Sequence, residues 1–147
     1  IGPDAFLQRE KTKISFEDNG GAQVMRVLSG KVLSVFGKGR ERPRNLSLVT
    51  STATIGIRGT GCYLEAEAAR TYFCLCYGEA EVTPRGDPKQ KEAIRTEHHD
   101  HPLVINASGE KLMVPAKVVN HTDAELTMLE NTVGRWPPFY GQGGNRY

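Results

Sequence analysis

One stretch of the chain, residues 48–78, combines the clearest strand pattern with all three cysteines. Its centre predicts a hairpin in which Cys62–Glu67 pairs with Arg70–Cys76 across a turn at Ala68 and Ala69. In an antiparallel pair, opposed residues share a face and successive residues alternate between faces. The hairpin therefore sorts its own side chains into two sets, and this sorting constrains the rest of the fold.

The two predicted faces differ in character. In this register Glu65 lies opposite Tyr72, Tyr63 opposite Cys74, and Gly61 opposite Cys76. The other face is apolar and predicts a core: it carries Cys62, Leu64, Ala66, Thr71, Phe73 and Leu75. We interpret the first face as a polar and aromatic surface whose two thiols, at i and i+2, can share one metal ion or one partner.

Short strands with glycine-containing turns account for most of the remaining sequence. The motifs Asn19-Gly20-Gly21 and Ser29-Gly30 supply the positive φ angles of tight hairpins, and Val, Ile and Phe between them favour a pleated surface. The strands expected from these patterns are 5–8, 13–17, 22–28, 31–36, 46–49, 53–58, 79–82, 92–95, 103–105 and 113–118. The predicted fold class is all-β, a mainly antiparallel β-roll or β-sandwich with one short C-terminal α-helix.

That helix begins at a capping box, Thr122-Asp123-Ala124-Glu125. Leu126, Leu129 and Val133 follow at i, i+3 and i+7 and form one apolar stripe, so a helix is predicted over 123–133. We divide the chain into a β domain at 1–118 and a C-terminal part at 119–147 that holds the helix and an aromatic, proline- and glycine-rich tail.

Charge and hydropathy exclude several functional classes. The 147 residues include 19 basic and 17 acidic side chains, and a net charge of +2 gives no reason to expect nucleic acid as a partner. No apolar run approaches the roughly 18 residues of a membrane-spanning helix, so no span is predicted. Cysteines at i and i+2 of one strand do not easily bond each other, so a disulfide scaffold is not predicted either.

The histidines supply the second half of a candidate metal site. Thiolates and imidazoles together suit zinc, copper or iron, and the sequence does not choose among them. Extended segments place His99 and His101 on one face, as they do Cys74 and Cys76. The candidate metal ligands are Cys74, Cys76, His98, His99, His101 and His121. The candidate binding residues beside them are Tyr63, Tyr72, Arg58 and Asp100.

Other interpretations of these residues stay open. The Cys-x-Cys spacing differs from the knuckles of structural zinc sites, and free cysteine is also a common core residue. Arg58 lies among glycines, where it can bind an anion or tie down a turn. A Cys74 or Cys76 thiolate beside His99 is also the arrangement of a thiol-dependent enzyme.

A family resemblance appears in the same region. The run 52–60, Thr-Ala-Thr-Ile-Gly-Ile-Arg-Gly-Thr, with the alternating strand after it resembles the signature of the FecR domain, and the resemblance covers roughly residues 1–83. A subgroup of these proteins resembles the chain further at 73–78, 98–100 and 120–126. The resemblance implies an extracytoplasmic, β-rich module of the bacterial cell envelope, with no established catalytic residue. It also implies earlier strands upstream of Ile1, so the β domain looks incomplete at its N-terminus.

We therefore expect a non-catalytic bacterial envelope module for binding or sensing, periplasmic or extracellular, with a transition metal as its small ligand. Its expected partner is an envelope protein or another copy of itself. One alternative is a structural or assembly protein that self-associates through an open sheet edge, since missing upstream strands would leave one. A second alternative is the thiol-dependent enzyme.

Overall fold

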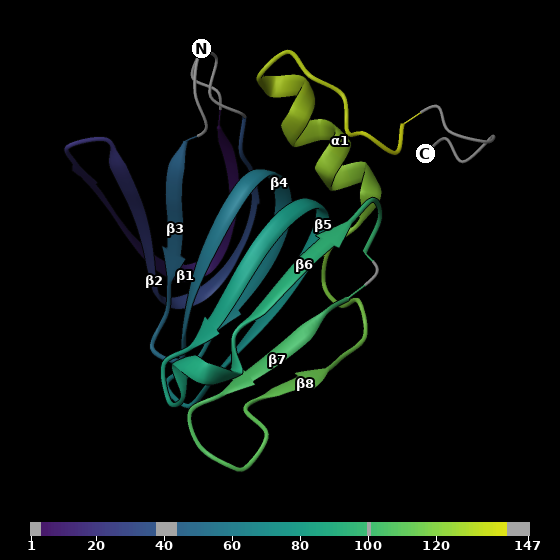
Figure 1. The fold of residues 1–147 in the computed structure, drawn as a ribbon. Coiled ribbons are helices and arrows are strands. Elements are labelled where there is room, and N and C mark those ends of the chain that lie inside the picture. The colour runs from purple at the N-terminus through teal and green to yellow at the C-terminus, as the bar shows by residue number, and fades with distance from the viewer. Residues whose placement is uncertain (1–3, 38–43, 100, 141–147) are drawn as a thin grey trace.

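The computed structural model describes residues 4–37, 44–99 and 101–140. Asp100, most of the basic loop at 38–44 and the final residues 141–147 lie outside them. Figure 1 shows a strongly curved β-sheet with a single helix, α1, packed at one end of it. The expected all-β class with one short C-terminal helix is confirmed, and the strands form one continuous, mostly antiparallel sheet.

The strands are longer than the sequence patterns indicated. The elements are β1 (Ala5–Asn19), β2 (Ala22–Val35), β3 (Asn45–Val49), β4 (Ala53–Ala66), β5 (Arg70–Pro84), a 3₁₀ turn η1 (Pro88–Gln90), β6 (Glu92–Thr96), β7 (Leu103–Asn106), β8 (Met113–Pro115) and α1 (Asp123–Thr132). Two pairs of expected short strands, 5–8 with 13–17 and 22–28 with 31–36, are each one continuous strand. The sequence predicts breaks at Ser29-Gly30 and near residues 9–12. In the structure neither strand is interrupted there, but the register of the β1–β2 ladder shifts, and the Thr12 hydroxyl forms hydrogen bonds with the backbone N–H and C=O of Lys31.

The order of strands across the sheet is β1-β2-β3-β4-β5-β7-β8, with β6 also paired to β5. The long strands change neighbours along their length. The first half of β2 pairs with β3 in parallel, and its second half pairs with β4. Similarly, β5 pairs with β7 over Arg70–Phe73 and with β6 over Gly78–Val82. The middle of β5, residues 74–77, therefore faces a gap between two neighbours, and this gap positions the site described below.

Both faces of the β4–β5 hairpin are buried along most of its length, which corrects one prediction. The expected core face lies in the larger apolar cluster, with Phe73 and Leu75 fully buried. The face predicted to be a polar surface is a second buried cluster, and Tyr63 and Cys74 on it have no exposed surface. The reason is α1, whose Leu126 and Leu129 cover this face together with Phe139 of the tail. The sequence alone could not show where the helix docks.

The register of the β4–β5 hairpin agrees with the prediction except near the glycines. Tyr63 pairs with Cys74 and Glu65 with Tyr72, as expected. Gly61, however, pairs with Tyr77 and not with Cys76, because the ladder shifts on either side of Gly61. Cys76 is thus an extra residue in β5, and both it and Tyr77 belong to the second cluster. A bulge of this kind re-aims side chains.

Gly78 lies beside this bulge and predicts a large mutational effect. Its φ is +101°, and a Cβ there would lie 2.5 Å from the carbonyl oxygen of Gly59. We expect Gly78→Ala to lower the free energy of unfolding by about 1–3 kcal/mol, because both the backbone conformation and the contact are unfavourable for alanine. Gly56→Ala in the neighbouring strand is the control, since nothing lies within 4 Å of the added Cβ. Urea unfolding of both variants measures the difference, and equal stability would contradict the prediction.

In the described part of the chain, no helix combines the length and apolarity needed to cross a membrane.

Candidate metal centre

The gap along β5 is filled by the loop between β6 and β7. This loop runs along the middle of β5 on the side away from β4, and its His99 amide donates a 2.9 Å hydrogen bond to the carbonyl of Cys76. His99 has a φ of +53°, a left-handed conformation that is uncommon for a non-glycine residue. The loop thereby turns the imidazole of His99 towards the thiols of β5.

A second segment brings His121 to the same place. Asn120, with a φ of +60°, turns the chain just before His121, and asparagine tolerates that conformation. The Tyr72 hydroxyl donates to the carbonyl of Lys117 and accepts from the amide of Val119, which fixes the path of this segment over the sheet. The carboxylate of Glu65 accepts from the Asn120 side chain and from the Tyr63 hydroxyl.

Four ligand atoms converge as a result. The Sγ of Cys74 lies 3.3 Å from Nδ1 of His99, and the Sγ of Cys76 lies 3.5 Å from Nε2 of His121. The two imidazole nitrogens are 3.3 Å apart, and all four atoms lie within 4.8 Å of one another. This group could hold a metal ion.

The spacing matches a tetrahedral ion. Zinc–sulfur and zinc–nitrogen bonds of about 2.3 and about 2.05 Å give tetrahedron edges of about 3.4 Å between nitrogens and about 3.6 Å between sulfur and nitrogen. The observed 3.3 Å between the nitrogens of His99 and His121, and the sulfur–nitrogen distances of 3.3 and 3.5 Å, are close to these edges. These three separations are therefore close to those around one zinc ion, and the four atoms as a group lie within 4.8 Å of one another.

Each imidazole is also held from behind by an oxygen. His121 Nδ1 lies 2.6 Å from the carbonyl oxygen of Val119, which can only accept, so Nδ1 carries a proton and Nε2 is the nitrogen that faces the thiols and is available to a metal ion when the ring is neutral. His99 Nε2 lies 2.8 Å from the Asp123 carboxylate, and its Nδ1 faces Cys74. Oxygen acceptors of this kind orient metal-binding histidines and set their tautomer.

Burial and ring stacking reinforce the arrangement. Cys74 and Cys76 have no exposed surface, and His121 is 7% exposed. The Tyr63 ring stacks on the imidazole of His121 at 4.6 Å between centroids, with 18° between the planes. Tyr63 and Tyr72, the predicted binding residues, therefore support the site indirectly. Tyr63 packs on His121, and Tyr72 holds the segment that leads to His121.

The ionisation of the two thiols differs. A hydrogen bond from Cys76, supplemented by bonds from His121 and His99, lowers the pKa of Cys74 to about 4 against the opposing effect of burial. Burial raises the pKa of Cys76 well above its ordinary value, with the neighbouring Cys74 thiolate adding to the effect. Cys74 is therefore a thiolate at neutral pH, and a metal ion would displace a proton from Cys76.

The charge on the histidine side is balanced by Asp123. Burial acts to lower the pKa of His99, but the contacts with Cys74 and Asp123 outweigh it and raise the pKa. Burial acts to raise the pKa of Asp123, but hydrogen bonds from His98 and His99 lower it. Asp123 is consequently an ionised carboxylate, able to stabilise the imidazole of His99.

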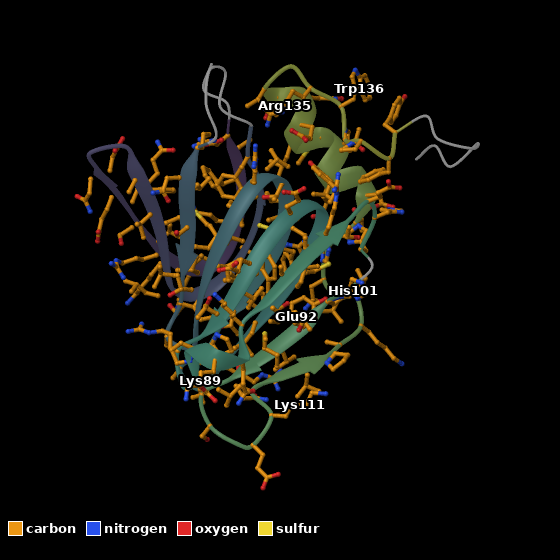
Figure 2. The ribbon with its side chains drawn as sticks, in the orientation of Figure 1. Lys89, Glu92, His101, Lys111, Arg135 and Trp136 are labelled. Atoms are coloured by element: carbon orange, nitrogen blue, oxygen red, sulfur yellow. The ribbon has the colours of Figure 1, made fainter. Side chains whose placement is uncertain are left out.

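The remaining predicted site residues lie elsewhere. His98 does not reach the thiols: its Nε2 lies 2.8 Å from the Asp123 carboxylate, and its ring packs on Phe139 at 4.5 Å. With His99 and Asp123 it forms a second group that could hold an ion. His101 is exposed and lines a separate cleft with Glu92 and Lys111 (Figure 2).

The other two predicted binding residues do not join the four ligand atoms. Arg58 is exposed and faces a different surface hollow, beside Glu79 and Arg95. Asp100 lies outside the described residues.

Asp123 is the residue that sequence reasoning passed over. We noted it as part of a capping box, and that box is present: Thr122 accepts from the Glu125 amide and Glu125 accepts from the Thr122 amide. The box fixes the first turn of α1 and thereby holds the Asp123 carboxylate in front of His99. The signal available in the sequence was the position of this acidic residue, two residues after the candidate ligand His121.

A substitution of Asp123 tests this role. If the four residues hold a zinc ion, we expect Asp123→Ala to weaken its binding by about 10- to 100-fold, the usual cost of losing an oxygen that orients a metal-binding histidine. Asp18→Ala, which removes an exposed carboxylate from the end of β1, is expected to leave the affinity unchanged. Competition with a zinc chelator measures both, and equal affinities would show that Asp123 does not support the site.

Comparison with known proteins shows likeness at the level of the fold. Two solved structures from Parabacteroides distasonis ATCC 8503, each described as a crystal structure of a "putative anti-sigma factor", are similar to this chain with TM-scores of 0.61 and 0.54. Sequence identity is 10% and 8%, and 86% of this chain is covered in each case. The chain spans 56% and 65% of the length of those two proteins. A scan of family models and a search of curated proteins found no match.

Proposed function

We propose that this chain is a non-catalytic binding module of the FecR type in the bacterial cell envelope, which holds one zinc ion through Cys74, Cys76, His99 and His121. One observation carries the proposal: two thiols and two imidazoles lie within 4.8 Å of one another, with one nitrogen–nitrogen and two sulfur–nitrogen distances close to those around zinc, and each imidazole is oriented by an oxygen behind it. Four protein ligands fill a tetrahedral site, which is typical of structural and regulatory zinc and not of catalytic zinc.

The choice of zinc among the three expected metals follows from the ligands. Two thiolates and two imidazoles in a tetrahedron are a preferred zinc set, while iron–sulfur clusters are held mainly by thiolates and copper(II) favours flatter geometries. The FecR resemblance and the fold of the two anti-sigma-like neighbours support a signalling context. An anti-sigma factor acts on another protein, so these neighbours support a protein partner. The envelope location that we propose, periplasmic or extracellular, rests on the FecR resemblance of the sequence alone.

Metal analysis of the purified chain tests the proposal. We expect about one zinc ion per chain after dialysis against a metal-free buffer, and none after treatment with a strong chelator. Copper or iron bound in the same ratio would support the same metal site but with a metal other than zinc. Absence of all three after reconstitution would overturn the proposal.

A thiol-dependent enzyme remains the second candidate because one observation favours it. Cys74, His99 and Asp123 form a continuous chain of hydrogen bonds in which an imidazole joins a low-pKa thiol to a carboxylate. The complete burial of Cys74 counts against it, because a nucleophile must be reached by its substrate. Rapid alkylation of Cys74 in the presence of saturating zinc would favour this candidate, whereas protection by zinc supports the metal site.

Self-assembly through a sheet edge has weaker support. In the described part of the sheet, β1 pairs with β2 alone, and Phe16 on it is 60% exposed. The strand also carries charges such as Lys11 and Lys13, which discourage edge-to-edge pairing. Light scattering over a concentration series tests for self-assembly, which would give large species whose size does not change when chelator is added.

A further inference from the structure

The four proposed ligands come from three segments that are far apart in the sequence. Cys74 and Cys76 lie on β5, His99 on the β6–β7 loop, and His121 on the segment that leads into α1. Cys76 and His121 are 45 positions apart. An ion bound here therefore links the start of α1 directly to the middle of the sheet.

Without such a link, and apart from the contacts of Asp123 with His98 and His99, the helix has modest means of docking. It has ten residues, shorter than isolated helices that are stable in water. Leu126 and Leu129 are its buried apolar side chains, and Glu130 accepts a 2.5 Å hydrogen bond from the Tyr77 hydroxyl. An ion pair between Arg9 and Glu125 adds a contact to β1 that is partly exposed and therefore weak.

The surface under the helix is apolar and would be unfavourable to expose. It includes Leu33 and Val35 of β2 with Tyr63, Tyr72 and Tyr77 of the β4–β5 hairpin, all at least 94% buried. Figure 1 shows α1 lying at one end of the sheet, joined to it by the segment after β8 and followed by the tail. If α1 left the sheet, it would uncover an apolar face together with the two thiols.

From these contacts we infer that zinc controls whether α1 is docked on the sheet. This inference rests on the proposed zinc site and adds a regulatory role to it. Zinc would favour the docked state, because His121 directly precedes α1 and the Asp123 carboxylate that supports His99 lies in the first turn of the helix. Loss of zinc releases α1 and exposes the second apolar cluster. Binding of the ion and docking of the helix are then linked, and each must favour the other.

Hydrogen exchange on the unmodified chain tests the linkage directly. We expect the backbone amides of residues 126–132 to exchange about 5- to 150-fold more slowly with saturating zinc than in its absence. Amides of β4 near Ile55, in the larger cluster, are the internal control and should change little, because that cluster does not include α1. Equal exchange of the helix amides with and without zinc, while zinc is bound, would overturn the inference and leave the proposed function intact.

The reciprocal effect is tested by weakening the docking at a residue that is not itself a ligand. Leu129→Ala truncates a buried apolar side chain of α1, and the linkage predicts zinc binding weaker by about 5- to 150-fold. Met128→Ala is the matched control, because Met128 is next to it on the same helix and 48% exposed. Unchanged zinc affinity in a folded Leu129→Ala protein would also overturn the inference.

The two failures are distinguishable. If the unmodified chain binds no zinc, the proposed function and the inference are both wrong. If it binds zinc, but zinc does not change the exchange of the helix amides and Leu129→Ala does not change the zinc affinity, only the inference is wrong. Should Leu129→Ala fail to fold, the exchange measurement on the unmodified chain still decides.

Discussion

Replacing both site cysteines, Cys74→Ser/Cys76→Ser, should reduce bound zinc from about one ion per chain to background. Structural zinc sites contribute about 10–16 kcal/mol of binding free energy at neutral pH, and this variant removes two of the four ligands. We expect a loss of about 5 kcal/mol or more, which is at least a roughly thousandfold weaker affinity. Elemental analysis and chelator competition on the purified variant measure the change.

Cys62→Ala is the matched control for that experiment. Cys62 is equally buried, at 1% exposed, but it lies on the opposite face of the hairpin in the larger cluster. The Cys62→Ala variant should retain full zinc content, with a lower free energy of unfolding because a small buried side chain is truncated. Full zinc content in the double variant, or its loss in Cys62→Ala, would place the metal somewhere other than the four proposed ligands.

Removal of zinc from the unmodified chain is expected to lower its melting temperature by roughly 10 °C. An ion present at about a thousandfold excess over its dissociation constant stabilises the state that binds it by about 4 kcal/mol. For a chain of 147 residues, each kcal/mol corresponds to about 2–4 °C in melting temperature. Thermal unfolding followed by circular dichroism, with zinc and with chelator, measures the shift.

The control for the thermal experiment is the double cysteine variant. Its melting temperature should be the same with zinc and with chelator, because its site no longer binds the ion. A chelator effect of equal size in that variant would mean that the stabilisation comes from another site or from non-specific binding. No shift in the unmodified chain would show that the four residues bind no zinc in the folded state.

The local pattern of the sequence predicted much of the fold. Alternation in the β4–β5 hairpin placed Tyr63 opposite Cys74 and Glu65 opposite Tyr72, because strand periodicity and a short turn fix the register. The capping box and apolar stripe placed the helix at 123–133, and the structure has α1 at Asp123–Thr132. These features depend on neighbours within a few residues, which a sequence displays directly.

The candidate site was predicted in part for the same reason. Two thiols at i and i+2 of a strand share a face, and the structure shows both in the second cluster. His99 and His121 meet them as the sequence interpretation required. His101 lies apart, because the left-handed turn at His99 ends the extended run that would have aligned the two side chains.

By itself, the sequence determined the helix segment, the positions of most strands though not their lengths, the face shared by the two thiols and the inventory of metal-binding side chains. Only the tertiary structure decided that the face is covered by α1, that Cys76 sits in a bulge, and that Asp123 stands behind His99. The physical reason is the separation along the chain of the residues that interact. Periodicity and capping act between residues close in the chain, whereas the meeting of the thiols with His99 and His121 depends on packing between segments more than 20 residues apart, which no local pattern encodes.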